Sequence, residues 1–464
     1  MSLPADLPHL DVITDADVLA SLSQDDAEWA PVGRPLAAVR PRSTEEVQQI
    51  VAECAKQRIP VVARGAGTGL SGGANAVDGC VVLDTSRMDR ILEIDPDNMI
   101  AVVQPGVIND NLKTAVAEHG FWYPPDPASA PWSTIGGNVA TNAGGLCCLK
   151  YGVTRDYVLG LQAVVGGPAG PYGTEVRVGH RTTKGVAGYD LVGLFVGSEG
   201  TLGIVTEITL RLRPARAASP RTVVGAFGSI VAAGEAVAAT TRRGLLPTAL
   251  ELLDRACLQA VEDWKHLGVS ATAEALLLAQ IDTPGAAGDE EATALTTIFR
   301  EAGAEWAEQS TDDIEAEALF AARRLAYPAL ERLGPVLTED VCVPRSAVPT
   351  MLASIEQIAA RHGVAIPTIA HAGDGNLHPL IRTPADDEHA RASAQSAFEE
   401  MLRAAIALGG TVTGEHGVGL LKRRGLRQEQ SAGVLSMQQA VKQALDPLGI
   451  FNPGKVLGDP ELGA

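Results

Sequence analysis

Apolar residues recur in short, regular groups along the first half of the chain. From Val47 to Cys54 they follow helical spacing after the capping sequence Ser43 to Glu46, which predicts an amphipathic helix. A second helix is predicted over residues 110–119. Short runs of strand-forming residues are predicted at 61–63, 80–84, 100–103, 161–165, 176–178 and 204–210. This mixture predicts an α+β domain that ends near Pro214.

The pattern changes after Arg216, where alanine becomes dense and glycine becomes rarer. Long helical patterns cover residues 230–243, 291–302 and 347–361, and short strands such as residues 275–281 lie between them. A second α+β domain is therefore predicted. Residues 446–455 indicate the end of a helix followed by turns.

Length and charge narrow the class of protein. With 464 residues the chain is too long for one compact core, so two or more domains are expected. Hydrophobic residues make up 46% and charged residues 20%, as in globular proteins. The net charge of −19 disfavours nucleic acid and anionic membrane surfaces as partners. An anionic substrate would need a local cation, either a metal ion or a few arginines.

Neither the cysteines nor the apolar segments indicate export or membrane insertion. The six cysteines show no C-x-x-C spacing, and we expect reduced thiols. Residues 1–17 lack the basic and apolar regions of a signal peptide. The weakly polar stretch 186–205 contains Asp190 and Glu199, so no transmembrane segment is predicted. The expected location is the cytoplasm.

A glycine-rich loop at residues 64–73 follows a predicted strand and could bind phosphate through bare backbone N–H groups. Gly67, Gly69 and Gly72 match the dinucleotide-binding spacing, but no helix pattern follows them. Taken alone, the loop could equally be an ordinary glycine-rich turn. Residues 124–145 and 197–203 add further small, donor-rich segments. Together the segments suit an extended cofactor that lies along the backbone.

A cluster of histidines indicates a second site. His371 and His378 flank a glycine-rich turn, and Glu415 and His416 lie together in another. Imidazoles and a carboxylate on turns suit a zinc or manganese ion with positions open for substrate. The alternative, in which these histidines only cap turns, stays open at this point.

On these motifs the chain resembles the FAD-linked oxidases of the vanillyl-alcohol oxidase type. Within them it is similar to the branch that holds D-lactate dehydrogenase, D-2-hydroxyglutarate dehydrogenase and the FAD subunit of glycolate oxidase. The resemblance runs from about Arg40 to Leu457. It implies an α+β fold with a two-subdomain FAD-binding domain, an α+β substrate or cap domain, and a C-terminal segment that returns to the flavin. The expected segments are residues 1–35 (N-terminal), 36–214 (FAD-binding), 215–440 (substrate or cap) and 441–464 (C-terminal).

The resemblance also implies which residues bind FAD. The pyrophosphate would contact Arg64, Gly65, Ala66, Gly67, Thr68, Gly69, Leu70 and Ser71. The flavin and ribityl chain would contact Asp126, Ser129, Thr134, Gly136, Gly137, Asn142 and Gly145. The adenosine half would contact Glu199, Gly200 and Ile204, and Asn452 and Lys455 would lie near the isoalloxazine. Thr68 stands where some relatives carry a linking histidine, so non-covalent FAD is expected.

For the second site, the resemblance implies His371, His378 and Glu415 as metal ligands and His416 as the general base. Asn376 and Arg323 would contact the substrate, and Tyr327 shares the helix face of Arg323. A metal lowers the pKa of a bound hydroxyl, and a histidine can then accept its proton. The hydride from C2 would pass to flavin N5.

The expected activity is that of an FAD-dependent dehydrogenase or oxidase for a short D-2-hydroxy acid such as D-lactate or glycolate. D-2-hydroxyglutarate dehydrogenase is an alternative, weakened because Thr338 stands where those enzymes carry a lysine. A non-redox flavoprotein, like the alkyl-glycerone-phosphate synthases, and an FAD subunit of a multi-chain glycolate oxidase are others. A quinone, an electron-transfer flavoprotein or an iron–sulfur partner could accept the electrons, and a homodimer is left open. Lys422, Arg423 and Arg424 are expected to form a surface cluster.

Overall fold

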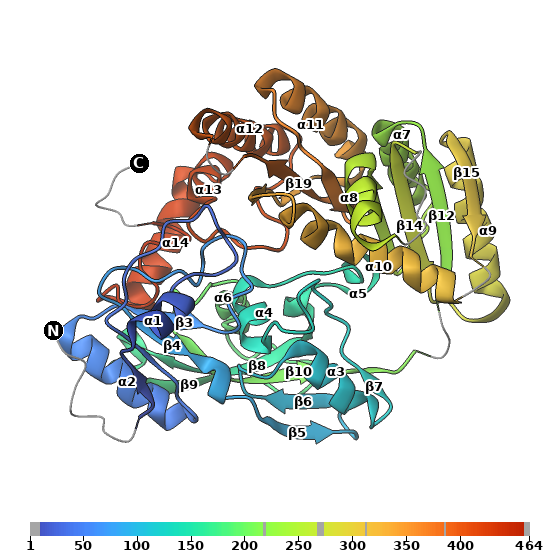
Figure 1. Cartoon of the computed structure of the whole chain (residues 1–464). Coiled ribbons are helices and arrows are strands. Elements are labelled where there is room, and N and C mark those ends of the chain that lie inside the picture. The colour runs from blue at the N-terminus through green and yellow to red at the C-terminus, as the bar shows by residue number, and fades with distance from the viewer. Residues whose placement is uncertain (1–9, 217–219, 267–272, 311–312, 385–386, 459–464) are drawn as a thin grey trace. The chain divides into compact units, whose positions relative to one another are not determined.

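The computed structural model describes residues 10–216, 220–266, 273–310, 313–384 and 387–458 (Figure 1). Contacts between Cα atoms divide the chain into two compact units. The first unit comprises residues 1–144, 153–215 and 415–464, and the second comprises residues 145–152 and 216–414. The division after residue 215 lies beside the expected boundary at residue 214. Residues 145–152 and 415–440 each pack in the unit other than the expected one.

One sheet of the first unit is mostly parallel. Its strands follow the order β1-β2-β4-β3, with bounds β1 (Val12–Ile13), β2 (Ala37–Val39), β3 (Val61–Arg64) and β4 (Val81–Asp84). Strands β2 and β3 run parallel to β4, and β1 runs antiparallel to β2. Residues near the C-terminus extend this sheet, because Val61 forms a parallel bridge with Phe451. The main-chain N–H of Val61 donates to the carbonyl of Ile450 at 2.7 Å.

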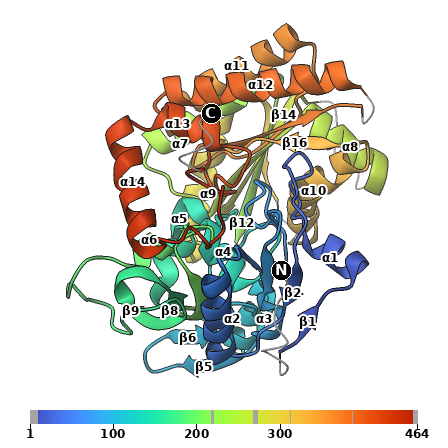
Figure 2. The same cartoon turned by 90° about the vertical axis from the view of Figure 1, so that its left-hand side faces the viewer.

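Helix α2 (Thr44–Gln57) confirms the first predicted helix and joins the two sheets of this unit. Ser43 caps it by accepting the main-chain N–H of Glu46 at 3.3 Å. Its buried residues share one core with strands of both sheets, including Val81 on β4 and Val164 on β8 (Val158–Val165). Figure 2 shows α2 beside β8. The amphipathic spacing seen in the sequence therefore serves to bury one face of the helix between two sheets.

The other sheet of the first unit is antiparallel. Its strands follow the order β5-β6-β10-β8-β9, with bounds β5 (Ile91–Asp95), β6 (Ile100–Val103), β8 (Val158–Val165), β9 (Thr174–Gly179) and β10 (Ile204–Arg211). Strand β8 is buried at every position, whereas β10 alternates between buried and less buried residues. Helices α3 (Asn109–Ala117) and α4 (Ile135–Thr141) contribute Leu112, Val116, Ile135 and Val139 to the core beneath this sheet. One face of the sheet is thus covered by helices.

The remaining elements of the first unit are short. They are α1 (Ala16–Leu22), α3 (Asn109–Ala117), α4 (Ile135–Thr141), α6 (Val192–Phe195), α13 (Arg423–Glu429), α14 (Ala432–Leu445), β7 (Phe121–Trp122) and β11 (Arg213–Pro214). Strands β7 and β11 pair with each other. Helix α3 confirms the helix predicted over residues 110–119.

The second unit is built on one antiparallel sheet. The strand order is β15-β12-β14-β13-β18-β19-β16, and β17 also pairs with β19. The bounds are β12 (Arg221–Phe227), β13 (Ala249–Asp254), β14 (Ala275–Ile281), β15 (Ala304–Gln309), β16 (Val336–Thr338), β17 (Val341–Cys342), β18 (Thr368–His371) and β19 (Asn376–Arg382). The predicted strand at residues 275–281 coincides with β14.

Helices cover both faces of this sheet. They are α5 (Cys148–Tyr151), α7 (Ile230–Arg242), α8 (Arg255–Lys265), α9 (Gly285–Glu301), α10 (Asp313–Glu331), α11 (Val348–His362) and α12 (Glu388–Ala407). Val224 on β12 packs in one core with Leu258 of α8 and Phe320 of α10. On the other face, Phe227 meets Phe299 of α9 edge-on, with ring centroids 6.0 Å apart. Strand β12 is apolar without alternation because both of its faces are buried.

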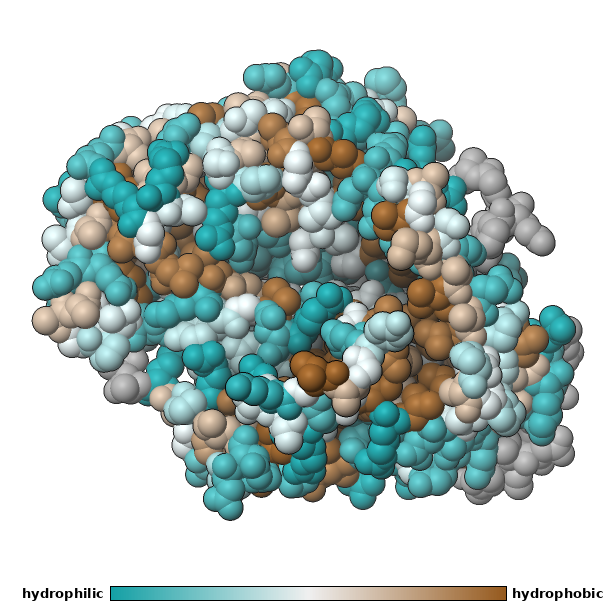
Figure 3. Space-filling model, turned by 180° about the vertical axis from the view of Figure 1, so that it is seen from behind, coloured by the Kyte–Doolittle hydropathy of each residue, from teal (hydrophilic) through white to brown (hydrophobic). Residues whose placement is uncertain are grey.

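The surface and the cysteines agree with the composition. Figure 3 shows hydrophilic residues spread over one face, with smaller apolar areas between them. All six cysteines are free thiols, as expected. Among the described residues no helix is both long enough and apolar enough to cross a membrane. The predicted α+β fold class is confirmed.

Candidate active site

The first glycine loop leaves β3 and continues to β4 without forming a helix, within fully described residues 65–80. Gly67 has φ +82°, and a Cβ there would lie 2.0 Å from Nη2 of Arg64. Gly72 has φ +77°, a conformation that favours glycine. The loop therefore presents bare backbone, as a phosphate-binding loop requires, in a geometry different from the strand–helix dinucleotide motif.

Asp25, a residue the sequence did not single out, holds this loop from the N-terminal side. Its carboxylate accepts the main-chain N–H groups of Ala27 and Ala74, both at 3.1 Å. Its own N–H donates to Oδ1 of Asn75 at 2.8 Å. Burial raises the pKa of the Asp25 carboxyl to about 6, against the lowering effect of these hydrogen bonds and of Arg64. The loop is thus fixed by a buried acid 50 residues away from Asn75 in sequence.

The second glycine segment lies against the first. Thr134 begins α4 and accepts the N–H of Gly137 at 3.2 Å. A Cβ on Gly65 would lie 2.3 Å from Oγ1 of Thr134, so the two segments meet where only glycine fits. Among the described residues, Ser133 Oγ and Asn138 Nδ2 are buried and have no hydrogen-bond partner. Buried polar atoms of this kind fit a polar ligand along the two segments.

The other predicted FAD-binding residues are distributed as follows. Asp126 and Ser129 lie in the loop before α4, and Asn142 ends α4 with φ 54°. Gly136 packs so closely on Pro105 that a Cβ would lie 2.5 Å from the Cβ of that proline. Gly145 belongs to the second unit. The first-unit residues frame one glycine-lined region, and this supports the fit to FAD.

Asn452 and Lys455 fasten the same loop from the C-terminal side. Asn452 Nδ2 donates to the carbonyls of Gly73 at 2.8 Å and Glu199 at 2.7 Å. Lys455 Nζ donates to the carbonyl of Asn75 at 2.7 Å. Burial lowers the pKa of the Lys455 ammonium to about 8. These two residues therefore support the glycine loop through its backbone.

Glu199 is buried, and its carboxylate is directed at the protein backbone. It accepts the N–H of Val418 at 2.7 Å and the N–H of Gly419 at 2.8 Å. Burial raises the pKa of the Glu199 carboxyl to about 7, although these hydrogen bonds and Lys422 lower it. Gly200 follows with φ +69°, and Ile204 is buried at the start of β10.

Lys422 was expected at the surface with Arg423 and Arg424, and this expectation is wrong. Its relative exposure is 1%, and its charge acts on Glu199. Arg423 is partly buried and donates to the carbonyl of Gly454 at 2.9 Å, whereas Arg424 is exposed. Three consecutive basic residues suggest a solvent-exposed position, but a buried acid can compensate the charge of one of them in the protein interior.

The second unit brings His371 and His378 together. His371 ends β18 and His378 lies on β19, and the antiparallel register pairs His371 with Asn376 and Ile369 with His378. Paired residues share one face of a sheet, so His371, Asn376 and His378 lie on the same face. The two imidazole rings are perpendicular, with centroids 5.2 Å apart. Both histidines are buried, at 5% and 4% exposure.

Glu251 on β13 orients His371. Nδ1 of His371 lies 2.9 Å from both carboxylate oxygens of Glu251. Nε of Arg323, from α10, lies 2.9 Å from Oε2 of the same glutamate. A carboxylate behind a histidine fixes the ring and leaves Nε2 as the coordinating nitrogen, an arrangement common in metal sites. Glu251 was not predicted from the sequence, because it lies 120 residues from His371.

Asp340 organises the other side of this cluster. Its Oδ1 accepts Nδ2 of Asn376 at 2.8 Å and lies 3.7 Å from Nδ1 of His378. Its Oδ2 accepts Oγ1 of Thr413 at 2.6 Å and the N–H of Gly414 at 3.0 Å. Asp340 is fully buried. It therefore links the histidine strands to the end of the second unit, immediately before Glu415 in sequence.

The predicted substrate residues on α10 lie close to this network. Arg323 is buried at 5% exposure, and its Nη2 has no hydrogen-bond partner among the described residues. Tyr327 packs at the edge of the core formed by α8, α10 and the sheet. Thr338 is buried on β16. Arg323 thus has a guanidinium nitrogen available for an anionic ligand.

Glu415 and His416 begin the last segment of the first unit. A Cβ on Gly144 would lie 2.3 Å from Oε2 of Glu415, so the glutamate packs directly on the second glycine segment. Ser71 Oγ donates to the carbonyl of Gly417 at 2.8 Å and to that of His416 at 3.3 Å. His416 is thereby tied through its backbone to the first glycine loop. Within the second unit, two buried imidazoles on adjacent strands, His371 and His378, have the donor chemistry that a divalent metal requires.

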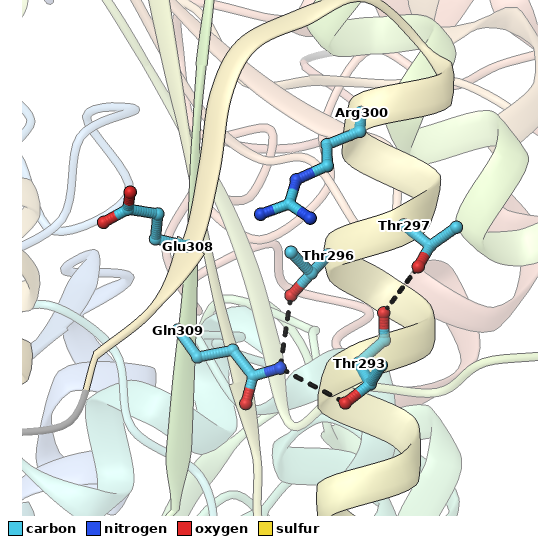
Figure 4. A pocket seen from close by; sticks show the side chains of 6 residues that line it. All are labelled: Thr293, Thr296, Thr297, Arg300, Glu308 and Gln309. Carbon is cyan, nitrogen blue, oxygen red and sulfur yellow. Dashed lines mark hydrogen bonds between the residues drawn. The ribbon is translucent and has the colours of Figure 1, made fainter.

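A surface pocket elsewhere in the second unit has no part in this arrangement (Figure 4). It has a volume of about 390 Å³ and is lined by Thr293, Thr296, Thr297, Arg300, Glu308 and Gln309. Gln309 Nε2 donates to Oγ1 of Thr293 at 3.4 Å and of Thr296 at 3.5 Å. The pocket lies at the β15 edge, and strands β12, β14 and β13 separate it from the histidine strand β18.

Comparisons with known proteins identify the family. Residues 35–169 match the family described as "FAD binding domain", and residues 216–456 match "FAD linked oxidases, C-terminal domain". Glycolate oxidase subunit GlcD of Bacillus subtilis is 42% identical over 423 residues, covering 91% of this chain and 89% of that protein. D-lactate dehydrogenase of Archaeoglobus fulgidus is 35% identical over 442 residues, covering 93% and 94%.

Solved structures show the same fold. A p-cresol methylhydroxylase with bound substrate superposes with a TM-score of 0.80 at 19% identity, covering 97% of this chain and 94% of that one. An alkyldihydroxyacetonephosphate synthase gives 0.72 at 19% identity, covering 97% and 84%. The family matches define the class as FAD-linked oxidases, and the superposed structures share the fold of this chain. The chain belongs to the FAD-linked oxidase family that includes glycolate oxidase subunits and D-lactate dehydrogenases.

The contact between the two glycine segments gives a first prediction. Gly65→Ala places a methyl group 2.3 Å from Oγ1 of Thr134, so the segments must separate. FAD affinity should fall by about tenfold or more, which corresponds to about 1.4 kcal/mol. Titration of the apoprotein with FAD, followed by flavin fluorescence, measures this. Gly433→Ala, on α14 with no close neighbour, is the control. Equal FAD affinity for both variants would contradict the prediction.

Proposed function

We propose that this protein is an FAD-dependent dehydrogenase that oxidises a short D-2-hydroxy acid, of the D-lactate or glycolate type, to the 2-oxo acid. The observation that carries the proposal is the buried network of Arg323, Glu251 and His371. It combines a cation with an available nitrogen for a carboxylate and a histidine oriented for coordination. The names of the similar proteins, a glycolate oxidase subunit and a D-lactate dehydrogenase, point to the same substrate class.

FAD would be held without a covalent bond by the first-loop residues Arg64 to Ser71 and by the second segment. In the second segment the proposed contacts are Asp126, Ser129, Thr134, Gly136, Gly137, Asn142 and Gly145. The bare backbone at Gly65, Gly67 and Gly72 supports this assignment. When bound, FAD supplies the hydride acceptor for the C2–H bond.

We further propose that His371, His378 and Glu415 hold a zinc or manganese ion. Its support is the chemistry of the donors and the carboxylate of Glu251, which orients the imidazole of His371. A divalent ion would supply a Lewis acid for the hydroxyl and carboxylate oxygens of the substrate. It would also provide the local positive charge that a protein of net charge −19 needs to bind an anion.

His416 is proposed as the general base that accepts the hydroxyl proton. Its backbone carbonyl is fixed by Ser71, which limits where the imidazole can lie. Arg323 would bind the substrate carboxylate, with Asn376 and Tyr327 as further contacts. The amide of Asn376 is held by Asp340 and by the carbonyl of Val341 at 3.2 Å, so its position is fixed before substrate arrives.

Among the alternatives, a multi-chain enzyme has specific support, because two similar proteins are named as glycolate oxidase subunits. In that case electrons would leave through a partner chain such as an iron–sulfur protein. D-2-hydroxyglutarate is less favoured, since buried Thr338 offers no cation for a second carboxylate. The likeness to alkyldihydroxyacetonephosphate synthase is one of fold alone, at 19% identity, and gives no support to a non-redox function.

The central experiment is an anaerobic absorbance titration of the FAD-loaded protein with D-lactate, glycolate and D-2-hydroxyglutarate separately. D-lactate or glycolate should bleach the oxidised flavin band, because hydride transfer reduces the flavin without any external acceptor. Bleaching by D-2-hydroxyglutarate alone would replace the proposed substrate. A flavin band unchanged by every acid, in metal-loaded protein, would contradict the proposed function.

His416→Ala should leave FAD bound and slow flavin reduction by about 10²- to 10⁴-fold, because the base is removed and the cofactor site is not. Stopped-flow absorbance under anaerobic conditions measures the reduction rate. His389→Ala, at an exposed position on α12, is the matched control and should reduce its flavin normally. Normal reduction in His416→Ala would remove His416 from the mechanism.

Removal of the metal should abolish turnover while FAD stays bound, because the proposed ligands His371, His378 and Glu415 are not among the proposed FAD contacts. Dialysis against a chelator followed by addition of Zn²⁺ or Mn²⁺ tests this, with metal content measured by atomic emission. His371→Ala should bind at least about tenfold less metal, since loss of one ligand weakens a three-ligand site. Full activity in protein shown to contain no metal would refute the metal proposal.

A further inference from the structure

We infer that Glu199 is a positioning residue, whose carboxylate fixes the segment Glu415 to Gly419. This segment carries the proposed metal ligand Glu415 and the proposed base His416, so the inference rests on the proposed function for what the segment does. The contact itself is a feature of the first unit. This contact was not predicted from the sequence, in which Glu199 was expected to contact the adenosine half of FAD.

Both oxygens of the Glu199 carboxylate are used by this segment. Oε1 accepts the N–H of Val418 at 2.7 Å, and Oε2 accepts the N–H of Gly419 at 2.8 Å. Glu199 is buried at 7% exposure, so water competes little for these hydrogen bonds. The two N–H groups lie two and three residues after His416. A carboxylate that accepts two successive N–H groups fixes the direction of the chain at that point.

The segment needs such a contact because its glycines allow the backbone many conformations. Gly417 has φ +85° and Gly419 has φ +49°, in a region that residues with a Cβ rarely adopt. A Cβ on Gly417 would lie 2.9 Å from Oε1 of Glu199, and a Cβ on Gly419 would lie 2.1 Å from the carbonyl oxygen of Ser71. The glutamate and the serine therefore pack on bare backbone from two directions.

Ser71 completes the attachment through the carbonyl groups of the same segment. Its Oγ donates to the carbonyls of Gly417 and His416, and its own carbonyl accepts the N–H of Leu420 at 2.7 Å. The hydroxyl of Ser71 therefore binds carbonyl groups of the same short stretch whose N–H groups Glu199 binds. The serine belongs to the first glycine loop, so the proposed base is coupled to the loop proposed to bind FAD.

Glu199 is itself held rigidly. It has φ 52°, its N–H donates to the carbonyl of Ala140 at 2.8 Å, and its carbonyl accepts Nδ2 of Asn452 at 2.7 Å. Lys422, buried at 1% exposure, provides a compensating positive charge. Because the backbone of Glu199 is fixed, its carboxylate can hold the glycine-rich segment in one orientation.

Glu199→Gln tests the inference in the full-length, FAD-loaded protein. The carboxamide can accept one of the two N–H groups, but its NH₂ group faces the other, so one hydrogen bond is lost. Hydrogen exchange of the peptide covering residues 415–421 should become at least about tenfold faster. The Kd for FAD should stay within about threefold, and kcat should fall by at least about tenfold because the base is misplaced. Glu207→Gln, at a partly exposed glutamate on β10, is the matched control.

Gly417→Ala disrupts the same contact at the glycine that packs on Glu199. It replaces Glu199→Gln as the test if Glu199→Gln does not fold. It should show the same pattern, with faster exchange, retained FAD and lower kcat. Unchanged exchange in the 415–421 peptide together with a loss of FAD affinity of more than about tenfold would make Glu199 a cofactor ligand and overturn the inference. Faster exchange with normal kcat would overturn it too, provided that His416→Ala is inactive. If His416→Ala is fully active, the proposed role of His416 fails, while the exchange data still decide whether Glu199 fixes the segment.

Discussion

Burying a carboxylate is costly unless both of its oxygens are satisfied, and this protein meets that constraint three times where its chemistry is proposed. Glu251 serves His371 and Arg323, Asp340 serves Asn376 and Gly414, and Glu199 serves Val418 and Gly419. Glu251 and Asp340 lie on or beside strands of the second unit, whereas Glu199 holds a loop of the first unit that contains two glycines with positive φ. The buried acids therefore hold the functional groups in fixed positions.

Glycine plays the complementary role. At Gly65, Gly144 and Gly417 a Cβ would collide with Thr134, Glu415 and Glu199 respectively. These glycines are therefore required by close packing between polar groups, in addition to any approach of the cofactor. Side chains and backbone meet there at distances that no residue other than glycine would allow. The flavin-binding segments, the proposed base and the proposed ligand Glu415 are therefore packed together within the first unit.

Much of the fold could be predicted from local pattern. The helix after Ser43 and the strand at residues 275–281 follow directly from spacing, capping and strand propensity. The supporting acids could not be found in this way. Glu251 lies in the apolar strand β13, and its histidine partner is 120 residues away, so nothing near it in sequence indicates a role. Asp25 and Asp340 are of the same kind. The burial of Lys422 could not be predicted, because neighbouring basic residues suggest a surface position, and Glu199, the buried acid on which its charge acts, is distant in sequence.

The path of the chain has a consequence for synthesis on the ribosome. The chain enters the second unit at residue 145, leaves it after 152, enters again at 216 and leaves after 414. Strand β3 meets its neighbour Phe451, and Glu199 meets Val418, only after the residues of the second unit have been made. Until then, β3 lacks its partner at one edge and the Glu199 carboxylate lacks the N–H groups that it accepts. The first unit begins first on the ribosome and is thus completed after the second unit.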